Sequence, residues 1–120
     1  MKQEDKELLL KDLCGRLPYG VKASTKVGGN IKISFMGYDT IIGEDGDSYD
    51  VSFITPYLFP LSSMTEEQRE EQKDLLDNQY HFDANGYVFT LQDFYCKYHI
   101  DYRGLIPMGL AIDATNLNIY

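Results

Sequence analysis

The spacing of apolar residues changes twice along this chain of 120 residues. Apolar side chains recur every three or four positions near the start, alternate with polar ones over residues 21–54, and return to the first spacing after Thr65. A period of about 3.6 residues is typical of an amphipathic helix, and a period of 2 is typical of a half-buried strand. The sequence therefore predicts an α+β domain with an N-terminal helix, a small antiparallel sheet and two C-terminal helices.

The N-terminal helix is expected over residues 3–14, because four leucines fall on one arc of it. Gly15 is expected to end this helix in a left-handed conformation, and Pro18 would prevent its continuation. The leucines of the arc are Leu9, Leu10, Leu13 and Leu17.

The sheet is expected to be an antiparallel meander, because the alternating segments are short and tight turns join them. It would either stay open or curl toward a small barrel. The candidate strands are residues 21–24, 31–35, 40–42 and 49–53.

The clearest helix start follows an extended, proline-containing run. Thr65 can accept from the backbone amide of Gln68, whose side chain can return the bond, so a capping box is predicted. At about 100° per residue, one arc of this helix is acidic and the opposite arc is uncharged. The acidic arc consists of Glu66, Glu67, Glu70, Asp74 and Asp77. Arg69 and Lys73 are placed to form ion pairs with Glu66 and Glu70. The uncharged arc consists of Met64, Gln68, Gln72, Leu75, Leu76 and Gln79.

Residues 78–86 are polar and are expected to form a turn whose corner is residues 83–86. A short strand at residues 87–89 and a third helix, capped by Thr90 with Asp93, should follow. Asp101 can cap a short turn before Pro107, and residues 113–120 are expected to be a loosely packed tail. The side chains predicted to be buried are Leu9, Leu13, Val51, Phe53, Leu75, Phe94 and Tyr98.

Length and composition fit a single globular domain over residues 1–120. The net charge of -8 argues against binding to a nucleic-acid backbone or an anionic membrane, since both need clustered Lys and Arg. No apolar run approaches the roughly 20 residues that span a bilayer, and the start MKQEDKE is unlike a signal peptide. We therefore expect a cytoplasmic protein without a membrane partner.

Candidate catalytic residues are few. Cys96 and His99 stand three apart on a predicted helix, so a thiol activated by an imidazole is a remote alternative, but the sequence shows no sign of an oxyanion site or a cleft. Zinc held by Cys14, His81, Cys96 and His99 would lack a second closely spaced ligand pair. The acidic run 44–50 lacks the ligand spacing of a calcium loop. We expect no enzyme activity, no metal and no cofactor, and free thiols at Cys14 and Cys96.

Three segments resemble a known group of proteins. Residues 6–22 (KELLLKDLCGRLPYGVK), 55–68 (TPYLFPLSSMTEEQ) and 99–114 (HIDYRGLIPMGLAIDA) are similar, in this order, to blocks of small uncharacterised proteins encoded by gut Bacteroidetes, their mobile elements and phages. The resemblance implies a bacterial or phage setting and covers under half of the chain. It supplies no activity, ligand or catalytic residue.

Two functions remain open. The first is a small accessory or adaptor domain that binds another protein, which the 10 tyrosines favour because tyrosine suits surfaces that are partly apolar and partly wet. The second is an acidic phage-type inhibitor that mimics nucleic-acid charge. The candidate interaction residues are Tyr57 and Tyr102 for the first function and the acidic arc for the second.

Overall fold

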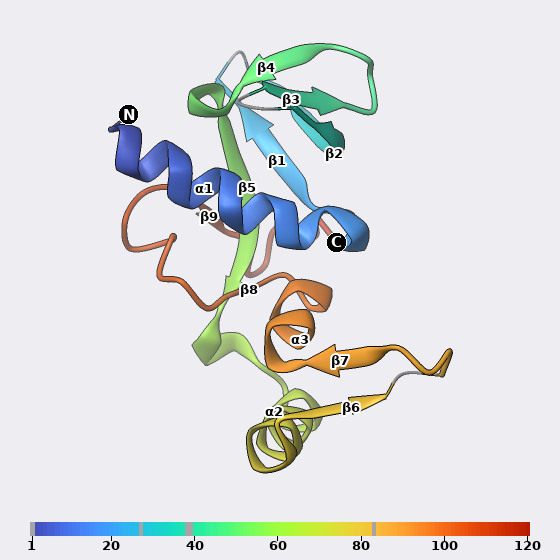
Figure 1. Ribbon diagram of the computed structural model, residues 1–120. Coiled ribbons are helices and arrows are strands. Elements are labelled where there is room, and N and C mark those ends of the chain that lie inside the picture. Colours follow the sequence, from blue (N-terminus) through green and yellow to red (C-terminus); the bar gives the residue numbers. More distant parts are fainter. Residues whose placement is uncertain (1, 27, 38–39, 83) are drawn as a thin grey trace.

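The computed structural model of the protein describes residues 2–26, 28–37, 40–82 and 84–120, and it confirms the predicted α+β fold (Figure 1). The α-helices are α1 (Gln3–Arg16), α2 (Glu66–Asn78) and α3 (Leu91–Lys97). The strands are β1 (Lys22–Thr25), β2 (Asn30–Met36), β3 (Thr40–Gly43), β4 (Ser48–Asp50), β5 (Ile54–Pro60), β6 (Tyr80–Phe82), β7 (Val88–Thr90), β8 (Ile100–Asp101) and β9 (Ile112–Asp113). Short 3₁₀ helices cover Leu17–Tyr19, Val51–Phe53 and Leu61–Ser63.

The main sheet runs in the order β4-β3-β2-β1-β5-β8, and the pairs from β4 to β5 are antiparallel. Within the described residues this path does not close, so the meander is open rather than a barrel. One feature differs from the expected antiparallel sheet: β8 and β9 both pair with β5 in parallel. These strands have two residues each, which is too short for a periodicity to reveal them.

Helix α1 lies across one face of this sheet (Figure 1) and buries Leu9 and Leu13 completely. The prediction that Gly15 ends the helix is wrong, since the helix continues to Arg16. Gly15 instead lies against α3, where a Cβ would stand 3.6 Å from the Cys96 Sγ. The left-handed residue comes later, at Gly20 with φ 77°, because Pro18 is accommodated in the first turn of a 3₁₀ helix.

The strand expected over residues 49–53 is interrupted. The carboxylate of Asp50 accepts a hydrogen bond from the Ser52 backbone N–H at 2.9 Å, which caps a 3₁₀ turn over Val51–Phe53. The turn removes Phe53 from the alternation, so this residue is 46% exposed and the prediction of its burial is wrong. Val51 is buried as predicted.

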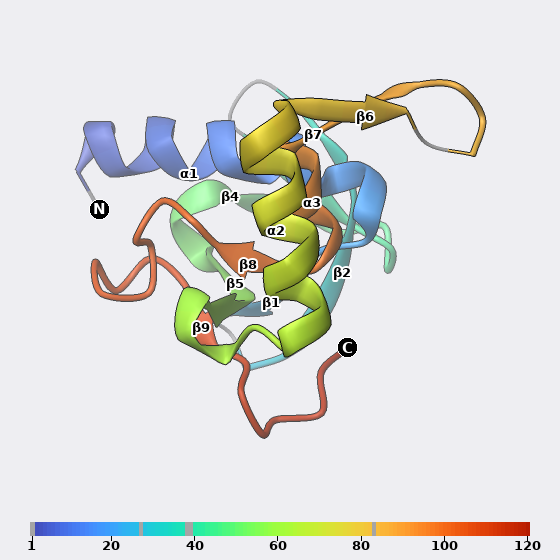
Figure 2. The same cartoon turned by 90° about the horizontal axis from the view of Figure 1, so that it is seen from below.

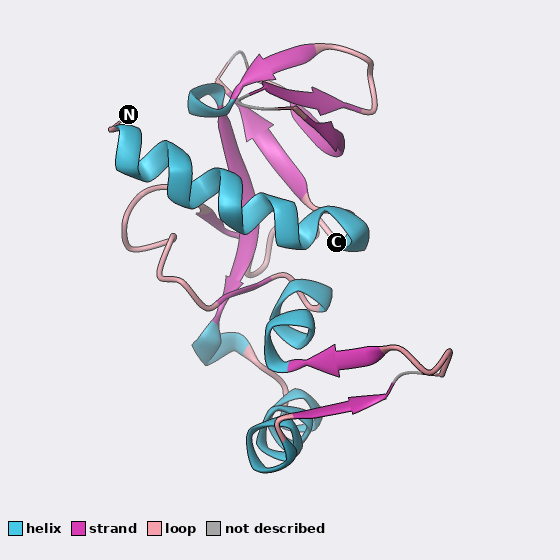
Figure 3. Cartoon of the chain, in the orientation of Figure 1, coloured by secondary structure: helices cyan, strands magenta, loops and turns pink. Residues whose placement is uncertain are grey.

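Between β5 and β8 the chain builds a separate unit, the hairpin lobe, made of α2, β6, β7 and α3 (Figure 3). Both predicted capping boxes are present, at Thr65 with Gln68 and at Thr90 with Asp93. The lobe has its own small core of Leu75, Phe89, Phe94 and Ile100, distinct from the core under α1. Tyr98, predicted to be buried, packs half-buried beside this core and donates to Glu71 at 3.0 Å.

The tail is held at both ends, which contradicts the expected loose packing of residues 113–120. At its start, Asp113 belongs to β9 and the Ala114 N–H donates to the Leu58 carbonyl at 2.8 Å. At its end, the Tyr120 ring stacks on His99 with 3.7 Å between centroids. Between these anchors, each of the residues 115–118 is exposed to solvent.

Candidate functional site

The β6–β7 hairpin projects from the body of the protein in both views (Figures 1 and 2). Strand β6 was not expected, because residues 78–86 are polar and turn-like in the sequence. The predicted turn occupies residues 84–86, and residue 83 of its predicted corner lies outside the described residues. The strands are antiparallel, with His81 opposite Phe89 and Phe82 opposite Val88. His81 and Phe89 stack at 5.1 Å on the face turned toward the lobe core, where Phe89 is only 9% exposed.

The other face of the hairpin, which we call the outer face, is apolar and open to solvent. It carries Tyr80, Phe82 and Val88, because side chains alternate between the two faces of a strand. These residues are 49%, 64% and 55% exposed, and the rings of Tyr80 and Phe82 meet edge to face at 5.9 Å. The described residues include eleven exposed large hydrophobic side chains, and five of them lie within 13 positions: Leu76, Tyr80, Phe82, Tyr87 and Val88.

Helix α2 presents the predicted acidic arc to solvent: Glu66, Glu67, Glu70, Asp74 and Asp77 are all exposed. One member connects the arc to the hairpin, since Asp74 Oδ2 lies 3.7 Å from His81 Nδ1. The ion pairs expected of Arg69 and Lys73 do not form with any described residue. Both bases instead lie beside Glu66 and Glu70 around one open depression.

Only part of the uncharged arc of α2 packs against the rest of the protein. Leu75 is buried, and Gln72 donates to the Tyr95 hydroxyl at 2.7 Å, so these two residues face α3. Leu76 is 59% exposed, because it lies about 100° around the helix from Leu75. An apolar side chain of α2 thus adds to the exposed apolar surface of the hairpin lobe.

The two candidate tyrosines, Tyr57 and Tyr102, differ in their exposure and in their contacts. Tyr57 is only 8% exposed and its hydroxyl donates to Asn30 Oδ1 at 2.7 Å, so it is a core residue and the prediction that it offers a binding surface is wrong. Tyr102 is half-buried, stacks on Tyr95 at 5.1 Å and lies under the guanidinium groups of Arg16 and Arg103. Its ring is therefore largely occupied by contacts within the protein.

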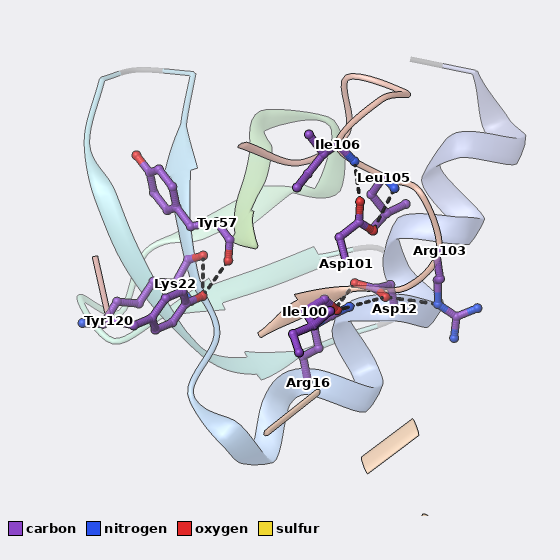
Figure 4. A network of polar contacts seen from close by, with 10 residues as sticks. All are labelled: Asp12, Arg16, Lys22, Tyr57, Ile100, Asp101, Arg103, Leu105, Ile106 and Tyr120. Carbon is purple, nitrogen blue, oxygen red and sulfur yellow. Dashed lines mark hydrogen bonds and ion pairs between the residues drawn. The ribbon is translucent and has the colours of Figure 1, made fainter. Parts of the chain in front are cut away.

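Figure 4 shows a buried ion pair between Asp12 and Arg16, which sequence reasoning missed. Asp12 and Arg16 are 1% and 0% exposed and share two hydrogen bonds of 2.7 and 3.2 Å. Arg16 also donates to the Ile100 carbonyl at 2.7 Å, and Arg103 Nε donates to Asp12 at 3.1 Å. The spacing of four between Asp12 and Arg16 was the available signal, although such pairs usually lie on the surface. The network connects α1 to β8, so its role is structural.

Cys96 and His99 share a turn, in which the His99 N–H donates to the Cys96 carbonyl at 3.2 Å. Burial raises the pKa of the Cys96 thiol, so the nucleophilic thiolate is disfavoured. Burial, together with the charges of Arg16 and Lys22, lowers the pKa of His99 from 6.5 to about 4. The imidazole stacks on Tyr120, and both cysteines are free thiols. This arrangement lacks the features of an activated thiol.

The described part of the chain shows neither a metal-binding cluster nor a helix that could cross a membrane. No group of three or more His, Cys, Asp or Glu residues is arranged to hold a metal ion there. None of the helices in those same ranges is both long and apolar enough to cross a membrane.

Comparison with known proteins adds no family. No family model, no curated protein and no solved structure matches this chain.

Proposed function

We propose that the protein is a small non-enzymatic accessory or adaptor module of a bacterium, a mobile element or a phage, and that it binds another protein through the hairpin lobe. The observation that carries this proposal is the exposed outer face of the β6–β7 hairpin. Contiguous apolar surface rimmed by polar residues is typical of protein–protein contact sites. Tyrosine and phenylalanine are also enriched in such contacts, and Tyr80 and Phe82 stand side by side here.

Helix α2 adds negatively charged side chains beside this surface. Its exposed acids, of which Asp74 lies beside His81 of the hairpin, would speed the approach of a partner with Lys or Arg around an apolar centre. The same acids, together with the net charge of -8, would repel a nucleic-acid backbone.

The second candidate is the acidic inhibitor that mimics nucleic acid. The solvent-exposed acidic arc favours it, and the interspersed Arg69 and Lys73 weaken it because they reduce the local negative potential. A charge mimic needs no exposed aromatic face. The two candidates therefore differ in which surface is essential.

Affinity capture from the native host, at low and high salt, tests both candidates. Four baits are compared: wild type, Tyr80→Ser/Phe82→Ser, Glu70→Lys/Asp74→Lys, and the control Phe35→Ser, which replaces an aromatic residue that is 58% exposed on β2. An adaptor should retain its partner at high salt and lose it only in the hairpin variant. A partner that is lost at high salt and in the charge-reversal variant, but not in the hairpin variant, would overturn this proposal in favour of the mimic.

A further inference from the structure

We propose that the open face of the main sheet holds a second binding site, which takes a phosphate group, either free or as the monoester of a small molecule. The site is a depression of about 290 Å³ between strands β1 and β2 and the C-terminal tail. These elements lie outside the hairpin lobe, so the site is separate from the surface that we propose for protein binding. Its lining consists of Lys22, Asn30, Ile31, Lys32, Asn118 and Ile119.

Two lysines face each other across the strands at this depression. Lys22 of β1 and Lys32 of β2 are direct partners in the antiparallel register. Their neighbours Ala23 and Ile31 are buried in the core with the leucines of α1, so both lysines project from the opposite face of the sheet. Like charges that are paired in this way across two strands destabilise a sheet. An anion bound between the two ammonium groups would remove that repulsion.

Both lysines retain unused hydrogen-bond donors. Lys22 Nζ donates to the Ile119 carbonyl at 2.8 Å, and Lys32 Nζ lies 3.5 Å from the carboxylate of the exposed Glu44. An ammonium group has three donors, so each lysine can still donate to a ligand. None of the described residues that line the depression is acidic, although the chain has 19 acids and 11 bases. The lining is thus basic within an acidic protein.

Asn30 adds an oriented amide beside the lysines. Its Oδ1 accepts a hydrogen bond from the buried Tyr57 hydroxyl at 2.7 Å, so its Nδ2 group is left as a donor. Asn118 supplies a second amide from the tail, where the backbone is left-handed with φ 54°. Ammonium and amide donors from two strands and the tail therefore surround one depression.

Charge and size select the class of ligand. A phosphate monoester carries about 1.5 to 2 negative charges at neutral pH, which matches two lysines better than a single carboxylate does. Pockets for drug-sized molecules measure about 300–1,000 Å³, so a depression of about 290 Å³ suits a small molecule rather than a polymer. Because the Lys32 side chain is 45% exposed, we expect weak binding, with a dissociation constant for free phosphate in the millimolar range.

Titration of the full chain with inorganic phosphate, followed through backbone amide chemical shifts by NMR, tests the inference. Saturable shifts should appear at Lys22, Asn30, Lys32 and Asn118, and the dissociation constant should rise between about 0.02 and about 0.2 M NaCl. Sodium acetate at the same ionic strength should bind at least about fivefold more weakly. Glycerol 3-phosphate is titrated in parallel. Tighter binding than that of phosphate identifies a monoester as the ligand, and equal binding identifies free phosphate.

Asn30→Asp is the most discriminating variant. Its carboxylate can still accept from Tyr57, but it replaces the amide donor and places a negative charge beside both lysines. Phosphate binding should therefore be lost while the melting temperature is kept or raised. Lys32→Gln should weaken phosphate binding at least about fivefold. The matched control is Lys26→Gln, which removes the same charge from an exposed lysine outside the lining and should change the dissociation constant less than about twofold.

Three results would overturn the inference. The first is a set of wild-type shifts that stay linear up to about 50 mM phosphate, and the second is equal binding of acetate. The third is unchanged phosphate binding in Asn30→Asp. Equal weakening by Lys32→Gln and Lys26→Gln would also contradict a defined site, because it would show only general screening of charge. The proposed function of the hairpin lobe stands or falls separately, since none of these variants alters that surface.

Discussion

The hydroxyl of Tyr120 accepts a hydrogen bond from the backbone N–H of Lys22 at 2.9 Å, although 98 positions separate the two residues. The same hydroxyl donates to the Tyr57 carbonyl at 2.9 Å (Figure 4). Strands β1 and β5 pair up to Ala23 and Pro56, so Lys22 and Tyr57 would be the next pair of the ladder. The Tyr120 side chain thus satisfies two backbone groups where the two strands separate.

Tyr120→Phe should lower the free energy of unfolding by about 1–2 kcal/mol, because it removes a partner from backbone groups while keeping the ring. Urea denaturation measures the change. Tyr80→Phe is the matched control, since that ring is half exposed on the hairpin, and it should stay within about 0.5 kcal/mol of wild type. Equal effects of the two substitutions would show that the Tyr120 hydroxyl does not hold the tail.

Asp12→Ala should destabilise the protein by about 3–5 kcal/mol, because Arg16 would keep a buried charge without its carboxylate. Arg103→Gln should cost less, since the Arg103 side chain is 18% exposed and leaves the pair of Asp12 and Arg16 intact. Thermal and urea unfolding measure both variants. A tolerated Asp12→Ala would mean that water reaches Arg16 in the folded protein.

Stability should fall as the pH drops from about 6.5 to about 4. His99 has a folded-state pKa of about 4 against 6.5 for the free group, so over this range the unfolded chain binds a proton that the folded chain does not. The contribution is complete above pH 6.5 and is lost progressively as the pH falls toward about 4. Unfolding measured at several pH values should show this slope.

His99→Asn should reduce that slope, because asparagine does not titrate and tolerates the left-handed φ of 58° at this position. The carboxylates of the protein titrate in both variants, so the difference between the two pH profiles isolates His99. Parallel profiles would show that His99 is accessible to protons in the folded state.

Phe94→Ala should cost about 3–5 kcal/mol, because this ring is fully buried in the lobe core between Tyr95 and Tyr98. Phe53→Ala should cost much less, since the 3₁₀ turn leaves its ring 46% exposed. Urea denaturation of the pair tests the assignment of these two rings. A larger loss for Phe53 would contradict it.

The local elements could be predicted from the sequence because their signals are local. The capping boxes at Thr65 and Thr90 each depend on two residues three positions apart, and both form. The alternation of residues 31–35 likewise predicts β2, since a strand with one buried face must alternate.

The candidate site could be predicted only in part, because burial and pairing depend on contacts between distant segments. The acidic arc follows from helix geometry alone, and it is exposed as expected. Strand β6 is recognisable only beside β7, and the buried Tyr57 donates its hydroxyl to Asn30, which is 27 positions away on β2. The ion pair of Asp12 and Arg16 has the spacing of a surface pair, and its burial depends on Ile100 from the far end of the chain.

The chain leaves the main sheet after β5 and returns to it as β8, directly alongside. The Phe59 N–H donates to the His99 carbonyl at 2.8 Å, so the two ends of the intervening segment are held together by the sheet itself. A loop whose ends are fixed in this way can change in length at little cost in closure entropy. The sheet with α1 should therefore tolerate intervening segments of different length between Phe59 and His99. Exchange of the segment between Phe59 and His99 would replace the surface that we propose for binding.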